Sequence, residues 1–494
     1  MKRKLESSLE NYDKVRIIDS DFVNNCKKEF DSSSQNLVIK NAITNVGSLH
    51  VTTDNNEARK VSHVFLNSIK NKKLKATDQG GSGRCWIFSG LNMFRHSVIN
   101  ALNLENFEFS ETYLFFWDKF ERSNTLLHMF DDYLKNNNHL NPNDNLFKYI
   151  THKEQWMSDG GYWNYFSNLV SKYGLIPKSA MPETAHSEYS SDMNTILIDI
   201  LHSGLNNMYQ LQTLRSKVEK ERQIKSVIDK TLQQIYTTLV KFLGEPPKTF
   251  NWSFVTEENE ANIIENLDAN GFKQMVLPGI NVEDFVVLVN IPGKKLPYYK
   301  KYMIKNTNNI IEKDCFTLIN LPIEELKKYS KKSILSGMPV WFGADVNKGF
   351  NPLYSSLDDN VNKNELIFGD RFNINKENRL LFSNQETCHA MTLIGVNINS
   401  KDKPINWQVE NSWGFYDNEE LGQDGFLCMS DKWFEDYVGQ VVIHKEFLSR
   451  KILNINKMEP VKIEAWESVT PALKINSKRF YKYDNIKLIR YKTR

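Results

Sequence analysis

A cysteine stands where a glycine-rich stretch meets a stretch of periodic apolar residues. The segment QGGSGRCW (79–86) precedes apolar residues spaced by three or four, at Ile87, Leu91, Phe94 and Val98. This spacing predicts a helix that begins at Cys85. The free N–H groups and positive dipole end of a helix N-terminus stabilise a thiolate, so we expect a lowered pKa for this thiol. Cys85 is therefore a candidate nucleophile.

A glutamine just upstream can assist that nucleophile. The side-chain NH₂ of Gln79 can donate to the oxyanion that forms when a carbonyl is attacked, and the backbone N–H of Cys85 can donate as well. A free cysteine is usually a buried packing residue. The flanking glutamine, glycines and Trp86 favour the chemical interpretation instead.

A histidine and an asparagine can complete a catalytic set. His389 opens the apolar run HAMTLIGV, and Asn411 follows in VENSWG. We expect the Asn411 amide oxygen to accept the Nδ1–H of His389 and so fix its tautomer, with Trp413 covering that hydrogen bond from water. Singly, each residue could be a core histidine or a turn asparagine. The order Cys, His, Asn favours catalysis.

Composition excludes several classes of protein. The chain has 494 residues, 40% of them hydrophobic and 25% charged, with a formal net charge of +3. These values argue against a wholly disordered chain and against a strongly charged binding protein. No apolar run approaches the ~18 residues of a membrane span, and the N-terminus has no secretory signal. Five scattered cysteines without a CxxC pair predict a reducing compartment, so we expect a soluble, cytoplasmic protein.

The chain divides into a helical part and a strand-rich part. Residues 192–243 predict two or three long helices, and a helical stretch is also expected around Asn55–Ile69. From Phe285 onward, short β-like runs alternate with turn residues. They are FVVLVNI, CFTLINL, PVWFGADV, AMTLIGVNI, WQVENSWG, GFLCMS and QVVIHKEF. A helical first half and an antiparallel second half predict the α+β class.

The motifs around Cys85 and Asn411 resemble those of the papain-like cysteine peptidases. His389 lies much farther from Cys85 than the ~130–150 residues typical of papain itself. Several longer motifs resemble the bleomycin hydrolase (aminopeptidase C) branch of that family, and the resemblance covers roughly residues 15–470. These motifs are FSETYLFFWDK (109–119), DGGYW (159–163), YGLIPK (173–178), MPET (181–184), LGEPPKTF (243–250), PVWFGADV (339–346) and WQVENSWG (407–414).

The resemblance implies a fold and an activity. It implies a papain-like α+β peptidase domain over residues 1–473, with a large helical insertion at about 190–245. It also implies a cysteine-type aminopeptidase that removes N-terminal residues from peptides through an acyl-thioester. Such proteins are cytosolic homohexamers with active sites facing an inner channel. Some of them bind nucleic acid, and no metal or organic cofactor is expected.

The resemblance also implies roles for individual residues. Cys85 would be the nucleophile, His389 the general base and acid, and Asn411 the residue that orients it. Gln79 would complete the oxyanion hole.

The remaining implied contacts are with the substrate. Gly160 and Gly161 would pair with an extended substrate, because a missing side chain permits close approach, and Trp413 would line the same site. Alone, the glycine pair would predict only a turn. Cys388, beside His389, lacks further ligands at metal-site spacing and is interpreted as a packing residue.

The C-terminus departs from the family pattern. In that family the chain ends soon after a Trp-Asp-Pro-Met-like segment, and its terminal carboxylate holds the amino group of the substrate. Here the matching stretch is 465–473, and a basic extension, 474–494, follows with eight Lys or Arg residues and one Asp. Trimming could restore an exopeptidase, an untrimmed tail could block the cleft, or a tail that leaves the cleft could permit endopeptidase cleavage.

The extension also leaves a second class of function open. Aromatic residues interleaved with its Lys and Arg could bind nucleic acid weakly or contact an anionic membrane surface. A solvated terminus is an equally good interpretation. The alternative to an enzyme is thus a nucleic-acid-binding oligomer that retains the peptidase scaffold. The presence of all four catalytic candidates argues against it.

Overall fold

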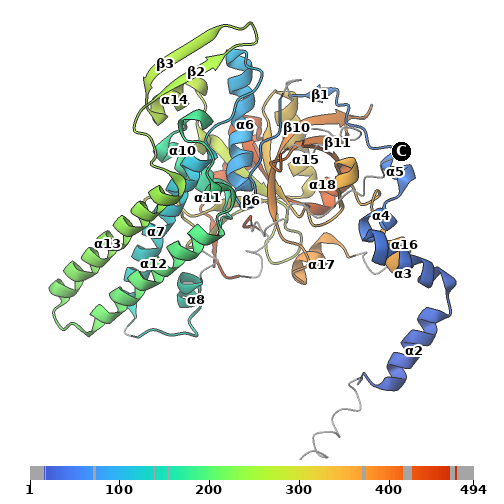
Figure 1. Ribbon diagram of the computed structural model, residues 1–494, viewed down its shortest axis with the longest axis horizontal. Coiled ribbons are helices and arrows are strands. Elements are labelled where there is room, and N and C mark those ends of the chain that lie inside the picture. Colours follow the sequence, from blue (N-terminus) through green and yellow to red (C-terminus); the bar gives the residue numbers. More distant parts are fainter. Residues whose placement is uncertain are drawn as a thin grey trace, which may run out of the picture. The chain divides into compact units, whose positions relative to one another are not determined.

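The computed structural model divides the chain into two compact units (Figure 1). The first comprises Met1–Ala58 and Asn360–Asn373, and the second comprises Arg59–Asp359 and Ile374–Arg494. The structure describes residue 16 and residues 18–69, 74–137, 139–152, 156–369, 374–414, 425–467 and 473–475.

The first unit contains short helices. They are α2 (Ser20–Asp31), α3 (Ser34–Val46), α4 (Ser48–Thr52), α5 (Asn55–Ala58) and α16 (Asn364–Phe368). The Asp19 side chain caps α2 by accepting a hydrogen bond from the Phe22 N–H at 2.8 Å. A bridge between Thr53 and Asn362 joins the two chain segments of the unit.

The helix expected around Asn55–Ile69 is wrong for most of its length. Helix α5 ends at Ala58, and Asn67–Ser68 forms strand β1 instead. This strand pairs with Gly395–Val396 of the central sheet. Hydrogen bonding to an existing sheet edge outweighs the local helical preference there.

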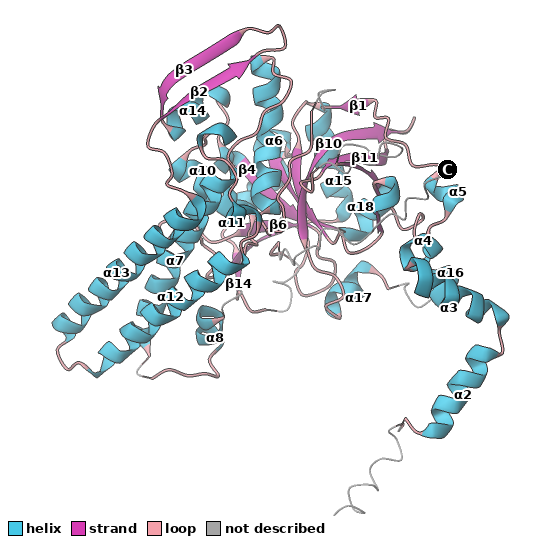
Figure 2. Ribbon diagram, viewed as in Figure 1, coloured by secondary structure: helices cyan, strands magenta, loops and turns pink. Residues whose placement is uncertain are grey.

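A twelve-stranded sheet forms the centre of the second unit (Figure 2). Its strand order is β14-β5-β6-β4-β13-β7-β10-β11-β12-β9-β8, with β1 beside β10. The strands are β4 (Phe285–Val289), β5 (Lys300–Ile304), β6 (Thr317–Asn320), β7 (Val340–Ala344), β8 (Phe350–Asn351), β9 (Ser356–Leu357), β10 (His389–Ile398), β11 (Pro404–Glu410), β12 (Phe426–Ser430), β13 (Val438–His444) and β14 (Val461–Ile463). A separate hairpin consists of β2 (Phe250–Val255) and β3 (Ala261–Leu267).

The second unit also contains helices, some packed against this sheet and others extending beyond it. They are α6 (Cys85–Leu102), α7 (Glu111–Asn136), α8 (Asn145–Thr151), α10 (Trp163–Tyr173), α11 (Ala185–Glu188), α12 (Ser191–Gln210), α13 (Lys217–Leu243), α14 (Ala269–Val276), α15 (Ile323–Leu335), α17 (Lys376–Leu381), α18 (Asp431–Tyr437) and α19 (Arg450–Asn456). Helices α12 and α13 occupy the stretch predicted to be helical and project side by side (Figure 1).

The α+β class follows from this arrangement, as the sequence predicted. Each of the seven predicted β-like runs contains a strand of the central sheet. Most strand pairs are antiparallel, but β14–β5, β4–β6 and β12–β9 are parallel. No helix of the described residues is long and apolar enough to cross a membrane.

Helix α6 is held firmly against the sheet. The Ser89 hydroxyl donates to the Met391 carbonyl at 2.6 Å, and the Thr392 hydroxyl donates to the Ser89 carbonyl at 3.0 Å. Trp341 of β7 donates its indole N–H to the Trp86 carbonyl at 3.2 Å. Because almost every residue of α6 is buried, these bonds fix its start relative to β7 and β10.

We expect Gly90→Ala to destabilise the protein. A Cβ at Gly90 would lie 2.6 Å from the Phe166 ring of α10. Overpacking of this kind costs about 1–3 kcal/mol, partly offset by the ~1 kcal/mol helix preference of alanine. We expect a net loss of up to about 2 kcal/mol in the free energy of unfolding, measured by urea denaturation. Ser97→Ala in the same helix is the control, and a Gly90→Ala variant as stable as that control would contradict the close α6–α10 packing.

Candidate active site

The Cys85 thiol lies at the first residue of α6, as predicted, but it is wholly buried. Burial raises the pKa of Cys85 to about 12, although hydrogen bonds from the backbone of Ala390, Trp86 and Cys85 itself favour the thiolate. The expectation of a lowered pKa is therefore wrong for this arrangement. Desolvation of the charged form outweighs the helix N-terminus. The contact with Ala390 nevertheless places the thiol beside the residue that follows His389.

His389 and Asn411 meet because of the register of two antiparallel strands. His389 begins β10, Asn411 follows the last residue of β11, and Thr392 pairs with Glu410. The start of one strand and the end of the other therefore lie at the same edge of the sheet. His389 Nε2 and Asn411 Oδ1 are 2.7 Å apart.

The hydrogen bond uses Nε2 of His389, so the expectation of an Nδ1 bond is wrong. The Asn411 Oδ1 atom also accepts the Ser412 N–H at 2.8 Å. As a carbonyl oxygen it can only accept, so Nε2 carries the hydrogen and Nδ1 is the basic nitrogen. Burial lowers the pKa of His389 to about 4, with the Asn411 bond opposing that shift. The resting ring is neutral.

Trp413 covers this pair. Its ring stacks on the His389 ring with centroids 4.6 Å apart and planes inclined by 28°. Trp413 also forms a bridge with Asp78, one residue before Gln79. The predicted cover of the His389–Asn411 hydrogen bond is thus present as a ring stack.

Gln79 is tied to the same segment through Ser412. The Gln79 N–H donates to the Ser412 carbonyl at 2.9 Å, and the Ser412 hydroxyl donates to Gln79 Oε1 at 2.7 Å. Gln79 Nε2 donates to the Ser82 carbonyl at 2.7 Å. An amide NH₂ has a second hydrogen, which can serve an oxyanion. Sequence reasoning gave Ser412 no role, and its place directly after Asn411 was the only signal.

Arg84 and Glu183 hold the glycine-rich loop and were also missed as a pair. The buried Arg84 guanidinium bonds both Glu183 carboxylate oxygens, at 3.1 and 2.7 Å, and its Nε donates to Ser82 Oγ at 2.8 Å. Such a bidentate pair fixes geometry as well as charge. Both residues lie in motifs that the sequence analysis quoted, but their pairing spans 99 positions.

Gly161 already pairs with a C-terminal segment of the chain itself, through an isolated bridge. The Ile475 N–H donates to the Gly161 carbonyl at 3.1 Å in an antiparallel bridge. Gly161 also needs to be glycine, because a Cβ there would lie 2.6 Å from the Trp86 ring. The Gly160 carbonyl accepts a hydrogen bond from Arg122 at 3.3 Å.

The Ile475 side chain lies against Gly343 of β7. Ile475 is fully buried, and a Cβ on Gly343 would lie 2.8 Å from its Cδ1 atom. Gly343 pairs with Ala390, whose backbone contacts Cys85. Gln440 anchors the segment that contains Ile475 by donating its side-chain N–H to the Leu473 carbonyl at 3.1 Å.

Residues assigned to the basic extension are therefore partly buried. Lys474 is only 5% exposed, and residues 476–494 lie outside the described residues. Cys388 packs beside the base, with its sulfur 3.6 Å from Asp345 Oδ1. Burial raises its thiol pKa well above the usual range. In the described part of the chain, no cluster of three His, Cys, Asp or Glu side chains could hold a metal ion.

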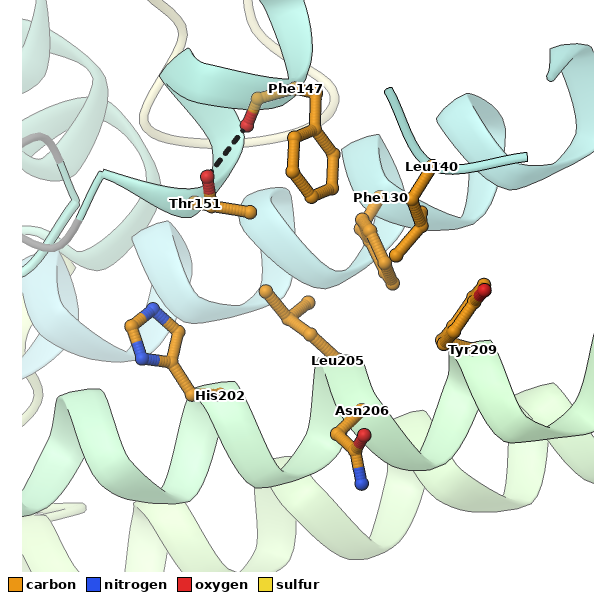
Figure 3. A pocket seen from close by; sticks show the side chains of 8 residues that line it. All are labelled: Phe130, Leu140, Phe147, Thr151, His202, Leu205, Asn206 and Tyr209. Atoms are coloured by element: carbon orange, nitrogen blue, oxygen red, sulfur yellow. Dashed lines mark hydrogen bonds between the residues drawn. The ribbon is translucent and has the colours of Figure 1, made fainter. Parts of the chain in front are cut away.

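A cavity of about 270 Å³ between α7, α8 and α12 contains none of these groups (Figure 3). Phe130, Leu140, Phe147, Leu205 and Tyr209 give it an apolar lining, and His202, Asn206 and Thr151 complete it. None of its residues is a predicted site residue.

Comparisons with known proteins identify the family of this chain. The Peptidase C1-like family is matched over residues 17–470. The chain is 34% identical to bleomycin hydrolase of Mus musculus, covering 91% of this chain and 97% of that protein. It is 30% identical to aminopeptidase C of Streptococcus thermophilus, covering 91% and 98%. The crystal structure of PepW from Lactobacillus rhamnosis is similar with a TM-score of 0.83 at 29% identity, covering 92% and 98%.

The chain belongs to the Peptidase C1-like family. The predicted membership of the bleomycin hydrolase and aminopeptidase C branch is confirmed, and so is the papain-like α+β fold. The chain is a cysteine peptidase, and its relatives class it with the cysteine aminopeptidases.

The burial of Cys85 predicts a steep pH dependence of its alkylation. With a pKa near 12, the thiolate fraction rises about tenfold for each pH unit below that value. We expect iodoacetamide to alkylate Cys85 of the full-length protein slowly at pH 7 and about tenfold faster per unit up to pH 10. Peptide mapping measures the rate, and the exposed Cys26 is the internal control. A Cys85 rate that is already constant from pH 6 would contradict this.

Proposed function

We propose that this protein is an aminopeptidase that cleaves peptides through an acyl-thioester on Cys85. One observation carries the proposal. The thiol at the start of α6 contacts the Ala390 backbone, next to a His389 ring that Asn411 holds with Nδ1 as its base. A nucleophile, a base and an orienting group thus come from three distant segments of the chain.

The residues divide the reaction into two steps. Nδ1 of His389 takes the proton of the Cys85 thiol as the sulfur attacks the substrate carbonyl carbon. The backbone N–H of Cys85 and the side chain of Gln79 donate to the oxyanion. His389 then protonates the leaving amine as the peptide bond breaks. A water that gives its proton to Nδ1 hydrolyses the thioester and restores the thiol.

We expect Cys85→Ser to lower kcat/KM for an aminoacyl coumarin amide by about 10³-fold or more, because the nucleophile is lost. The thermal melting temperature should change little, since the two side chains are similar in size. Cys388→Ser is the matched control at a neighbouring buried cysteine and should keep most activity. Equal activity of Cys85→Ser and wild type would refute the proposed nucleophile.

The pairing of Ile475 with Gly161 supports the choice of an exopeptidase. The antiparallel pairing directs the carboxyl side of Ile475 toward Gly160 and Asp159, and Asp159 bonds Gly83, two residues before Cys85. A chain ending at Ile475 would therefore present its carboxylate near the thiol. That carboxylate could bind the ammonium of a peptide N-terminus. We propose that removal of residues 476–494 produces this form.

Two truncations test that specificity. A variant ending at Ile475 should cleave a substrate with a free N-terminus at least about tenfold better than its N-acetylated twin, because the acetylated substrate has no ammonium and leaves the terminal carboxylate without a partner charge. A variant ending at Glu467 lacks Ile475, so the bridge to Gly161 is lost, and this variant should cleave both substrates. The two kcat/KM values are compared for each variant and for the full-length protein, whose C-terminal mass is recorded. Equal cleavage of both substrates by the Ile475 variant would contradict the terminal anchor.

An endopeptidase is the alternative if the chain keeps its full length. Residues 474–494 would then not supply the anchor, and internal bonds could be cut. Weak nucleic-acid binding by this segment also stays a prediction. The burial of Lys474 removes one of its eight cationic side chains from the surface, which weakens that alternative.

Assembly into a homo-oligomer, a homohexamer by the family resemblance, is supported by the first unit. Helices α2 and α3 have no buried residue. Their large apolar side chains are therefore exposed, among them Val23, Phe30, Leu37, Val38 and Val46. Such unpartnered apolar side chains suit a protein interface. A cytoplasmic location is part of the same proposal, based on five free cysteines in the sequence without a CxxC pair.

A further inference from the structure

Asp159 joins several segments of the site through hydrogen bonds. One carboxylate oxygen accepts the Gly83 N–H at 3.0 Å and the Ser190 hydroxyl. The other accepts Lys119 Nζ at 3.0 Å and Asn194 Nδ2 at 2.8 Å. Its backbone carbonyl accepts the Trp86 indole N–H at 2.6 Å.

These partners come from functionally different parts of the fold. Gly83 belongs to the loop before the nucleophile, and Trp86 follows the nucleophile in α6. Asp159 itself directly precedes Gly160 and Gly161. These two glycines form the segment that is proposed to pair with the substrate, and it is named the substrate strand. Ser190 is the N-cap residue of α12, and Asn194 lies in its first turn. One carboxylate therefore connects the nucleophile loop, the substrate strand and the helical insertion.

The carboxylate stays charged in a buried position. Its side chain is 9% exposed, and that of Lys119 is fully buried. Burial tends to raise the pKa of Asp159, but Lys119 and the bonds from Gly83, Ser190 and Asn194 outweigh it and hold that pKa well below its usual range.

Helix α7 continues this ionic network beneath the glycine pair. Arg122 pairs with Asp118 of the same helix, and it donates to the Ser158 and Gly160 carbonyls on either side of Asp159. Lys119 also donates to the Ser158 carbonyl, at 3.1 Å. The backbone around Asp159 is thus held from α7, while its carboxylate is held from both α7, through Lys119, and the start of α12.

We propose that Asp159 is a positioning residue through which helix α12 aligns the nucleophile with the substrate strand. The inference rests on the proposed peptidase function. Gly83 lies two residues before Cys85, whose N–H is the proposed oxyanion donor, while Gly161 lies two residues after Asp159. A shift at the carboxylate changes the distance between the attacking sulfur and the bound carbonyl. Misplacement by about 1 Å can cost 10²-fold in rate.

This gives the helical insertion a catalytic purpose. The Ser190 hydroxyl and the Asn194 amide are neutral donors, so their removal leaves no buried charge without its partner. Lys119 alone would then hold the free side of the carboxylate. The position of the Gly83 loop would depend on a longer and more flexible side chain. The folded state should survive this change better than the alignment does.

The test is the double variant Ser190→Ala/Asn194→Ala in the full-length chain or in the chain ending at Ile475, whichever form is active. The matched control is Ser191→Ala/Thr195→Ala, which changes exposed side chains in the same helical turn. The measurements are active-site titre, kcat and KM for the coumarin amide, iodoacetamide alkylation of Cys85 and melting temperature. Asp159→Asn is a second variant, expected to lose about 100-fold in kcat/KM, but it leaves Lys119 buried without its partner charge.

We expect the Ser190/Asn194 variant to lose about tenfold in kcat per titrated site. Its KM, its alkylation rate and the titre should stay close to those of the control, because alkylation needs the thiol but not the oxyanion geometry. A kcat per site equal to that of the control would overturn the inference, even with Asp159→Asn inactive. A lower titre with an unchanged kcat per site would show a purely structural role and would also overturn it. Wild-type inactivity would instead refute the proposed function.

Discussion

The packing of the first turn of α6 against the start of β10 is the contact on which the site depends. It brings Cys85 against the Ala390 backbone and fixes His389 beside it. Every other part of the site supports one side of this contact. Ser89, Thr392 and Trp341 hold the helix to the sheet. The adjacent residues Asn411 and Ser412 then link the histidine to Gln79, because Asn411 bonds His389 and Ser412 bonds Gln79.

Burial gives this contact a cost. In the arrangement described, the thiol and the imidazole are both neutral, because desolvation raises the pKa of Cys85 and lowers that of His389. The buried Ile475 side chain lies against Gly343, which pairs with Ala390. A substrate that pairs with Gly161 must compete with the Ile475 N–H for the Gly161 backbone. The segment at Ile475 can therefore both keep substrate away from Gly161 and determine which end of a peptide is accepted.

The sequence could name candidate site residues but not the contacts that hold them. Cys85, His389, Asn411 and Gln79 could be named because their motifs are local and their residue types are chemically specific, whereas Gly161 was named only through the family resemblance. The pKa of Cys85 and the ring nitrogen that Asn411 uses could not be predicted, since both depend on burial and on strand register. The helix around Asn55–Ile69 failed because β1 pairs with a strand more than 300 positions away. The role of Asp159 could not be predicted because its partners come from distant segments, Lys119 from α7 and Ser190 and Asn194 from the start of α12.

The most direct test is to trap the covalent intermediate. Full-length and Ile475-terminated protein would be mixed with a slowly hydrolysed aminoacyl ester, quenched in acid and digested for mass spectrometry. The account predicts an acyl group on the peptide that contains Cys85, lost in Cys85→Ser and kept in Cys388→Ser. Hydrolysis of the ester without any adduct on Cys85, or with an adduct on another residue, would contradict a mechanism through this thiol.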